Sequence, residues 1–334
     1  MDKYEFVSEL GSGHYGTVSL YKNKITGKQE AIKFIPRGKA ITTHVLWEIG
    51  HLIQMDHPMV IGFNEAFLTQ DNLCISMEHA NSGDLFSVLV NNGPLTESEA
   101  HYFFGQVVTA LAACHEQEVV HRDVKLENVL LVTDETGMTT AKLCDFGMSK
   151  HHLACHKSMI GTPAYMAPEI FDRKNEKGYD GTKTDVWACG VLLYLMLFGK
   201  YPFEDDHNPL DLKLTVRNIR RGQFYFPKSD DGSGAYETSV QVRDLISRML
   251  TSSPTDRITI QGVMEHPWFK QYKTVCVKTL PKYPRSEQTM EDIYKIYEEA
   301  KNDGFSFTGT HKKLKTIDGC VNVAPPVFGT MVTA

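Results

Sequence analysis

The alternation of apolar and polar residues changes character once along the chain. Within residues 4–35, the segments YEFVSEL, TVSLYKN and QEAIKFI partly alternate β-branched or aromatic residues with polar ones, and Gly-containing turns separate them. This pattern predicts an antiparallel meander of strands. A helix is expected over Thr42 to Gln54, where apolar residues recur at helical spacing, and strands are expected around Phe63 and from Leu73 to Met77.

Helical periodicity takes over after the polar stretch HANSGD at residues 79–84. Long segments with an apolar face begin near residues 96, 184 and 240, and Thr96 and Ser98 are the expected N-caps of the first. A further helix is expected near residues 287–301, and no periodicity follows residue 304. The sequence therefore predicts an α+β protein: a small N-terminal unit of antiparallel sheet plus one main helix, and a larger, mostly helical C-terminal unit.

Composition indicates a folded protein with a sizeable core, because 42% of the 334 residues are hydrophobic and 23% are charged. A formal net charge of −6 favours protein or small-molecule partners over nucleic acid. The seven cysteines are scattered without CxxC spacing, which favours reduced thiols over disulfides or a zinc site. No run of about 18 apolar residues and no signal-peptide pattern occurs, so we expect no membrane insertion and a cytoplasmic or nuclear location.

The first motif that carries chemistry is a glycine-rich G-x-G-x-x-G-x-V loop, in which missing side chains let backbone N–H groups approach phosphates. Its members are Gly11, Gly13, Gly16 and Val18. A dinucleotide-binding loop of this spacing requires a helix directly after it, whereas here a predicted strand follows. Lys33 is expected to pair with nucleotide phosphates and to be held by Glu48 on the predicted helix; the alternative is a solvated strand lysine.

The second motif, HRDVKLEN at residues 121–128, matches the H-R-D-x-K-x-x-N arrangement used in phosphoryl transfer. Asp123 is expected to orient the attacking hydroxyl and accept its proton, and Lys125 to neutralise charge on the transferred phosphoryl group. Asn128 and Asp145 are expected to be Mg²⁺ ligands, because Mg²⁺ prefers oxygen donors. Asp145 stands in a DFG sequence, 22 residues after Asp123.

These motifs, together with APE at residues 167–169, occur in the order found in eukaryotic protein kinases, which the chain resembles from Tyr4 to Phe269. The resemblance implies a bilobal fold, ATP and Mg²⁺ as cofactors with Mn²⁺ as a substitute, and protein substrates. The implied units are an N-lobe (4–78), a hinge (78–84), a C-lobe (85–269) and a regulatory tail (270–334).

The resemblance also assigns residues to the nucleotide site and to the supports of the catalytic loop. Around adenine it implies Val18, Ala31 and Leu130. Elsewhere in the nucleotide site it implies Met77 as gatekeeper, Glu78 to Ala80 as hinge, and Asp84. A hydrophobic column is implied at Leu52, Phe63, His121 and Phe146. Asp185 is implied to brace the catalytic loop, and Arg257 to pair with Glu169.

Two features indicate the substrate class. Lys125 after the catalytic aspartate and Thr162 in GTPAY resemble Ser/Thr kinases rather than tyrosine kinases. Glu127, Asp84 and the acidic residues 204–206 are expected to form a negative cleft for an arginine upstream of the phosphorylated residue. For residues 204–206, a solvated acidic loop is the alternative.

Arg122, beside Asp123, is expected to bind a phosphate on the segment between DFG and APE. Ser158 is the expected phosphorylation site, and Lys150 and His44 are expected to gather around the phosphate with Arg122. This mode of activation requires an upstream activating kinase and an opposing phosphatase.

The sequences CDFGMSK, KSMIGTPAYMAPE and YPFED resemble plant kinases of the sucrose-nonfermenting-related type, second subfamily, which respond to osmotic stress and abscisic acid. The resemblance implies a role in stress signalling. It also implies that the helix near 287–301 docks on the helix carrying Glu48, through Met290, Ile293 and Tyr297 on one face.

Three features depart from that subfamily: Met159 replaces a second phosphorylatable residue, residues 228–237 form an added loop, and no acidic C-terminal run is present. A calcium/calmodulin-type or AMP-activated-type kinase is therefore the alternative. Among other classes, a pseudokinase scaffold usually lacks a residue such as Lys33, Asp123 or Asp145, and this chain has all three. A small-molecule phosphotransferase has no need for the APE-terminated segment.

Overall fold

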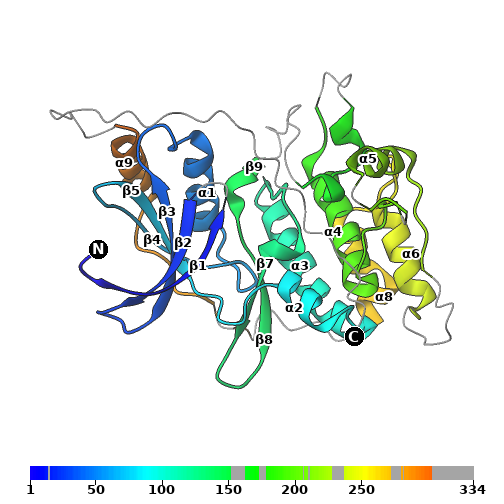
Figure 1. Ribbon diagram of the computed structural model, residues 1–334, viewed down its shortest axis with the longest axis horizontal. Helices are drawn as coiled ribbons and strands as arrows, with labels where there is room; N and C mark the ends of the chain where they lie inside the picture. The colour runs from blue at the N-terminus through cyan, green and yellow to red at the C-terminus, as the bar shows by residue number, and fades with distance from the viewer. Residues whose placement is uncertain are drawn as a thin grey trace.

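The computed structural model describes residues 1–13, 16–151, 162–172, 178–205, 207–209, 211–227, 237–271, 280 and 282–302. Figure 1 shows two parts side by side, a sheet with helices packed on it and a larger group of helices. This arrangement confirms the α+β, bilobal architecture that the sequence predicted. None of the helices in these ranges is both long and apolar enough to cross a membrane.

The N-terminal part is a five-stranded antiparallel sheet with the strand order β1-β2-β3-β5-β4. Its strands are β1 (Tyr4–Gly13), β2 (Gly16–Asn23), β3 (Gln29–Pro36), β4 (Phe63–Leu68) and β5 (Asn72–Glu78). The predicted meander is confirmed for β1 to β3. Gly16 begins β2 with a φ of 148°, and a Cβ atom there would collide with the Phe34 carbonyl, so this position requires glycine.

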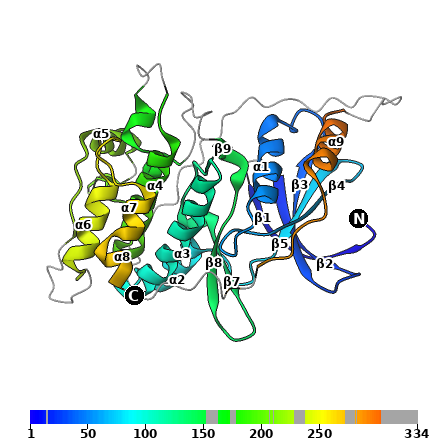
Figure 2. The same ribbon diagram turned by 180° about the vertical axis from the view of Figure 1, so that it is seen from behind.

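Two helices pack on this sheet, although their sequences lie far apart. α1 (Thr43–Gln54) has Thr42 as its N-cap residue and buries Val45, Ile49 and Leu52. α9 (Met290–Lys301) lies beside α1 and contacts β4 and β5, as both Figure 1 and Figure 2 show. The predicted tail helix is thus part of the N-terminal lobe in space.

The C-terminal part is built around α4, which is buried along nearly its whole length. Its helices are α2 (Leu85–Asn92), α3 (Glu97–Glu116), α4 (Gly181–Phe198), α5 (Leu212–Arg221), α6 (Val240–Met249), α7 (Ile260–Glu265) and α8 (Pro267–Gln271). α4 contacts α3 and α6, which explains why it is apolar on all sides. Thr96 caps α3 in a capping box with Glu99, whereas the prediction of Ser98 as a cap was wrong because Ser98 lies inside the helix.

Short elements between the two parts carry the catalytic sequences. They are the strands β6 (Val119–Val120), β7 (Val129–Thr133), β8 (Thr139–Leu143) and β9 (Lys150–His151), and the 3₁₀ turns η1 (Leu126–Asn128), η2 (Phe146–Met148), η4 (Pro163–Tyr165) and η5 (Pro168–Phe171). β6 pairs with β9 and β7 pairs with β8, both antiparallel. The HRD sequence directly follows β6, and the DFG sequence lies between β8 and β9. Because β6 pairs with β9, the two sequences lie close together.

Candidate active site

Lys33 of β3 and Glu48 of α1 form a buried ion pair, with 2.5 Å between Lys33 Nζ and Glu48 Oε1. Burial by itself lowers the pKa of Lys33, but the carboxylates of Glu48 and Asp145 outweigh burial and raise that pKa. Burial raises the pKa of Glu48, and Lys33 offsets only part of this effect. Lys33 is therefore a fixed internal cation, not the solvated lysine of the alternative interpretation.

The catalytic loop is held by hydrogen bonds among its own residues. Lys125 Nζ donates to Asp123 Oδ2 at 2.7 Å, and Asn128 Nδ2 donates to the same oxygen at 3.0 Å and to the Asp123 carbonyl at 2.8 Å. Lys125 Nζ also lies 3.5 Å from Thr162 Oγ1. Within the described ranges no donor reaches Asp123 Oδ1, so this oxygen can accept a proton from an incoming hydroxyl.

Asp185 of α4 holds the backbone of this loop. Its buried carboxylate accepts hydrogen bonds from the N–H groups of His121 at 2.9 Å and Arg122 at 2.8 Å, and it lies 2.8 Å from His115 Nε2. Arg122 has a φ of 69°, a left-handed conformation that is uncommon outside glycine. The carboxylate stabilises this conformation, which in turn fixes the direction of Asp123.

The other internal supports lie where the kinase resemblance implied. All members of the hydrophobic column are buried: Leu52, Phe63, His121 and Phe146. The rings of His121 and Phe146 contact each other with centroids 5.0 Å apart. Arg257 binds Glu169 through two N–H···O bonds of 2.7 and 2.9 Å, which anchors the APE sequence to the helical lobe.

The residues predicted to bind metal offer two uncommitted oxygen atoms. Asp145 Oδ1 accepts a hydrogen bond from the Gly147 N–H at 3.2 Å, and the Asn128 carbonyl accepts one from the Cys144 N–H at 3.0 Å. No donor among the described residues reaches Asp145 Oδ2 or Asn128 Oδ1. Two oxygen donors fit Mg²⁺, which takes few protein ligands and completes its shell with phosphates and water.

The residues implied around adenine lie on neighbouring elements. Val18 belongs to β2, and Ala31 of β3 faces Met77 of β5. Leu130 of β7 forms a backbone bridge with Asp84, which directly precedes α2. The structure thus brings both lobes together at this position.

Two hinge residues have side-chain roles that the sequence did not indicate. Glu78 forms an ion pair with Lys142 at 2.8 Å and accepts a hydrogen bond from the Gly62 N–H at 3.0 Å. Asp84 caps α2, where it accepts hydrogen bonds from Ser87 N–H at 2.7 Å and Ser87 Oγ at 2.9 Å. A contact of Glu78 with a nucleotide would therefore come from the main chain, whereas the partly exposed Asp84 carboxylate keeps acceptor capacity.

Glu127 is the member of the expected negative cleft that keeps an unpaired carboxylate oxygen within the described ranges. Its Oε2 atom is buried and has no hydrogen-bond partner in the part of the chain that the structure describes. Burial raises the pKa of Glu127, and the positive charge of Lys125 opposes this effect only in part. Asp205 instead caps its own turn through the N–H groups of His207 and Asn208, and Asp206 lies outside the described residues.

The three predicted phosphate-sensing residues lie close together. The guanidinium of Arg122 donates to the Met148 carbonyl at 3.3 Å and to Tyr179 Oη at 3.2 Å. His44 and Lys150 both contact Trp47: the ring centroids of His44 and Trp47 are 5.3 Å apart, and Lys150 Nζ also lies 5.3 Å from the Trp47 centroid. Burial and the charges of Lys150 and Arg122 lower the pKa of His44. Ser158 lies outside the described residues.

His51, which the sequence analysis missed, links α1 to the DFG segment. Its Nδ1 lies 2.6 Å from Ser149 Oγ, and that hydroxyl donates to the Phe146 carbonyl at 2.5 Å. Because the single hydroxyl proton goes to Phe146, His51 is the donor to Ser149. No sequence spacing relates these two residues, so only the tertiary structure shows this contact.

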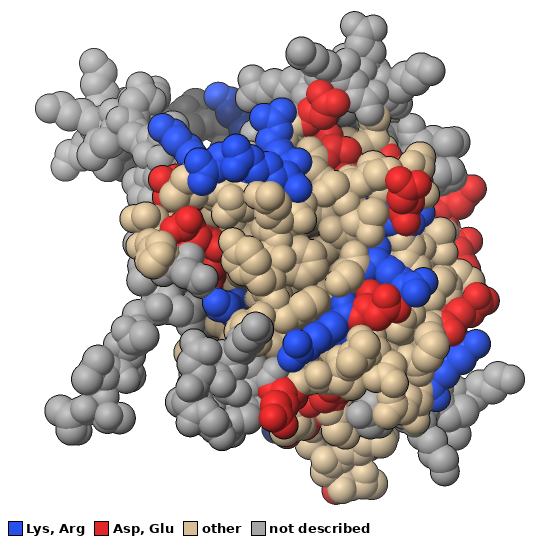
Figure 3. All heavy atoms as spheres, turned by 90° about the vertical axis from the view of Figure 1, so that its right-hand side faces the viewer, with Lys and Arg blue, Asp and Glu red and all other residues tan. Residues whose placement is uncertain are grey.

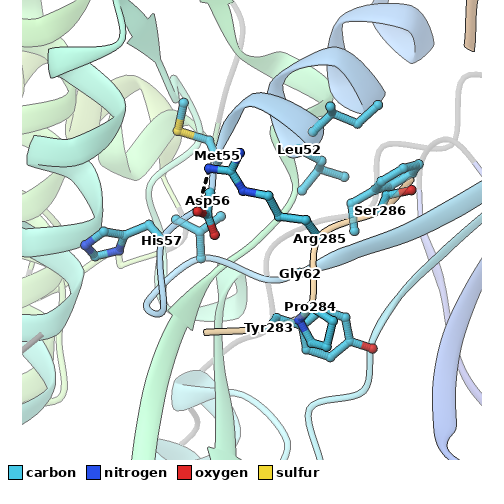
Figure 4. Close-up of a pocket in the computed structure, with 12 residues that line it drawn as sticks. Leu52, Met55, Asp56, His57, Gly62, Tyr283, Pro284, Arg285 and Ser286 are labelled. Carbon is cyan, nitrogen blue, oxygen red and sulfur yellow. Dashed lines mark hydrogen bonds and ion pairs between the residues drawn. The ribbon is translucent and has the colours of Figure 1, made fainter. Parts of the chain in front are cut away.

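An extended tail segment and α9 together hold α1 from outside. Tyr283 packs its ring against Gly62, and Arg285 and Lys282 form ion pairs with Asp56 at 2.5 and 3.1 Å. Figure 4 shows Arg285 reaching Asp56 at the edge of a pocket of about 140 Å³ between this segment and the end of α1. The carboxylate therefore ties the tail to the turn that follows α1.

The implied docking residues of α9 differ in how deeply they are buried. Ile293 and Tyr297 are buried, as is Ala300, whereas Met290 is 46% exposed but still lies against Gly50 of α1. Met290 is the first residue of the helix, and its thioether lies beside Gly50 of α1. Ile293 and Tyr297 are thus the main docking residues.

Comparisons with known proteins point to one family. The family model described as "Protein kinase domain" matches residues 4–269. The chain is 39% identical over 315 residues to "Serine/threonine-protein kinase SAPK1" of Oryza sativa subsp. japonica, covering 91% of this chain and 88% of the relative. It is 40% identical to "Serine/threonine-protein kinase SRK2H" of Arabidopsis thaliana, covering 90% and 84%. It is 38% identical to "Serine/threonine-protein kinase SRK2A" of Physcomitrium patens, covering 93% and 88%.

Proposed function

The chain belongs to the protein kinase family and is a protein-serine/threonine kinase, and from this premise we propose that it transfers the γ-phosphoryl group of MgATP to Ser and Thr hydroxyls of other proteins. The observation that carries the proposal is the convergence of the Lys33–Glu48 pair with Asp123, Asn128 and Asp145. This set contains the positioning and charge-neutralising groups that phosphoryl transfer requires.

The chain's own residues account for each part of the reaction. Lys33, fixed by Glu48, would hold the phosphates in place, and Asp123 Oδ1 would orient the hydroxyl and take its proton. Lys125, which bonds to Asp123 Oδ2, would neutralise negative charge that develops on the phosphoryl oxygens. Bound at Asn128 and Asp145, Mg²⁺ or the chemically similar Mn²⁺ would neutralise phosphate charge.

Transfer from labelled ATP to a basic protein substrate tests this proposal. Asp145→Ala should abolish transfer, because it removes an expected metal ligand, whereas Asp71→Ala, in the exposed turn between β4 and β5, should leave transfer unchanged. If the native chain fails to label the protein, or if Asp145→Ala labels it equally well, the proposed function is wrong and a scaffold role takes its place.

Activation by phosphorylation at Ser158 is the second part of the proposal. It is supported by the proximity of Arg122, Lys150 and His44. Besides burial, which is the larger cause, the charges of Lys150 and Arg122 lower the pKa of His44, so the three side chains lie in one positive field that a phosphate would neutralise. One to three charge-assisted hydrogen bonds of this kind would shift the equilibrium by about 1–3 kcal/mol. An upstream kinase and a phosphatase would set the occupancy.

Measured activity against Ser158 occupancy tests this second part. Ser158→Ala should lower activity by roughly 5- to 150-fold relative to the phosphorylated protein, which corresponds to that energy range. Ser233→Ala serves as the matched control and should retain full activity. Full activity of Ser158→Ala would remove the regulatory proposal and leave the catalytic one intact.

Stress signalling in the cytoplasm or nucleus completes the proposal. It is supported by similarity over most of the length of the plant kinases and by the docking of α9 on α1. An osmotic shock to cells that express the chain should raise Ser158 phosphorylation, as measured by mass spectrometry. Unchanged occupancy after the shock would favour the calcium/calmodulin-type or AMP-activated-type alternative.

A further inference from the structure

Helix α5 presents four cations on its exposed surface. Lys213, Arg217, Arg220 and Arg221 recur at helical spacing and line a shallow groove together with Val216. Figure 3, which faces this end of the molecule, shows a group of Lys and Arg side chains gathered at its upper edge. We call these four residues the α5 basic face.

The charges of the α5 basic face are not neutralised by ion pairs within the described ranges. None of its four side chains forms an ion pair there, although the chain as a whole carries a net charge of −6. The helix beneath is firmly anchored: Thr215 and Ile219 are buried, and Asp211 caps its N-terminus. The cations are therefore displayed on a preformed support.

Helix stability does not explain these four cations. Arg220 and Arg221 in the last turn interact favourably with the helix dipole, but Lys213 stands in the first turn, where a positive charge is unfavourable. Lys213–Arg217 and Arg217–Arg221 are like-charge pairs at i,i+4 spacing, which destabilise a helix. A surface that opposes the stability of its own helix points to a binding role.

The position of α5 indicates which molecule would meet it. α5 contacts the turns η4 and η5, and η4 directly follows Thr162, which lies against Lys125 of the catalytic loop. A protein whose hydroxyl group reaches Asp123 would therefore extend another part of its surface toward α5. We propose that the α5 basic face docks an acidic region of protein substrates, remote from the phosphorylated residue; this inference rests on the proposed function.

Other occupants fit the charges less well. Residues 303–334 of the chain itself contain three lysines and two aspartates, so this segment offers no negative run to the face. Nucleic acid and anionic membranes are repelled by the net negative charge of the chain, and the single ten-residue helix α5 is a small surface with which to offset that repulsion. A protein substrate, in contrast, must already approach this lobe.

Two fusion substrates test the proposal. Both carry one phosphoacceptor segment and a Gly-Ser linker, which leads in one to a run of about ten glutamates and in the other to an uncharged run of equal length. The native kinase should show a KM about fivefold to tenfold lower for the acidic fusion, with similar kcat, and this advantage should vanish near 0.5 M salt because surface charges are screened.

A matched pair of variants separates docking from general electrostatics. Replacing all four residues of the α5 basic face with Ala should equalise the two KM values. The control replaces Lys22, Lys24, Lys28 and Lys39 with Ala; these are exposed, lie in the N-terminal lobe, and form no ion pair among the described residues. This variant loses the same charge and should keep the advantage of the acidic fusion.

Three results would overturn the proposal: no advantage of the acidic fusion with the native kinase, an equal loss of that advantage in both variants, or α5-dependent binding of duplex DNA or phosphatidylserine vesicles without such an advantage. Failure of the native kinase to phosphorylate either fusion would instead contradict the proposed function. The two failures are thus distinguishable.

Discussion

At the scale of single residues, the surroundings of Glu127 predict a preference for substrates with an arginine upstream of the phosphorylated residue. Its Oε2 has no hydrogen-bond partner in the described part of the chain and the residue is partly exposed, so we expect an arginine guanidinium to supply donors to this carboxylate. A hydrogen bond to a charged group contributes about 1.5–3 kcal/mol, or roughly 10-fold to 150-fold. Glu127→Gln should reduce by this factor the ratio of kcat/KM values for peptides with and without an upstream Arg.

The pH dependence of this ratio provides an independent measurement. Because burial raises the pKa of Glu127, acidification protonates this carboxyl at a higher pH than an ordinary glutamate of pKa about 4.3. Only the ionised carboxylate binds a guanidinium strongly, so the preference for Arg should fall as the pH is lowered through the raised pKa. Glu127→Gln should show no such fall, and exposed Glu135→Gln should behave like the native protein.

At the scale of secondary-structure elements, α9 should support the position of α1. Ile293 and Tyr297 are nearly inaccessible to solvent, and truncating a buried apolar side chain to Ala costs about 2–5 kcal/mol. The exposed ion pairs of Arg285 and Lys282 with Asp56 contribute about 0–1 kcal/mol each, so apolar burial dominates the docking. Ile293→Ala combined with Tyr297→Ala should lower both Tm and kcat/KM, because α1 carries Glu48.

The same helix provides the control for this experiment. Tyr294 is 54% exposed, so Tyr294→Ala should leave Tm and kcat/KM close to the native values. If the double variant melts earlier but keeps native kcat/KM, α9 contributes stability without positioning α1.

At the scale of the whole molecule, a nucleotide bound between the lobes should stabilise both. The lobes already meet through the buried Glu78–Lys142 pair and the backbone bridge of Val60 with Leu143. A ligand at 100 times its Kd adds about 2.7 kcal/mol to the free energy of unfolding. Thermal denaturation with MgATP should therefore show a raised Tm, and Asp145→Ala should lose the Mg²⁺-dependent part of the rise. An equal Tm with and without MgATP would contradict nucleotide binding between the lobes.

The sequence by itself determined the elements and the chemistry of the site. Strands, helices and the N-cap at Thr96 follow from local periodicity and capping, which depend on residues a few positions apart. The HRD and DFG motifs singled out Asp123, Asn128 and Asp145 as the expected reacting and metal-binding groups, because the order and spacing of these motifs are typical of protein kinases.

Only the tertiary structure decided how side chains distant in sequence use their bonding capacity. Lys142 forms an ion pair with the Glu78 carboxylate, Ser149 forms a hydrogen bond with His51, and the α5 basic face lies beside η4. Burial and hydrogen-bond competition settle these outcomes, because a buried polar group must find a partner wherever packing places one. Such partners are set by the arrangement of whole elements in space, which no local pattern encodes.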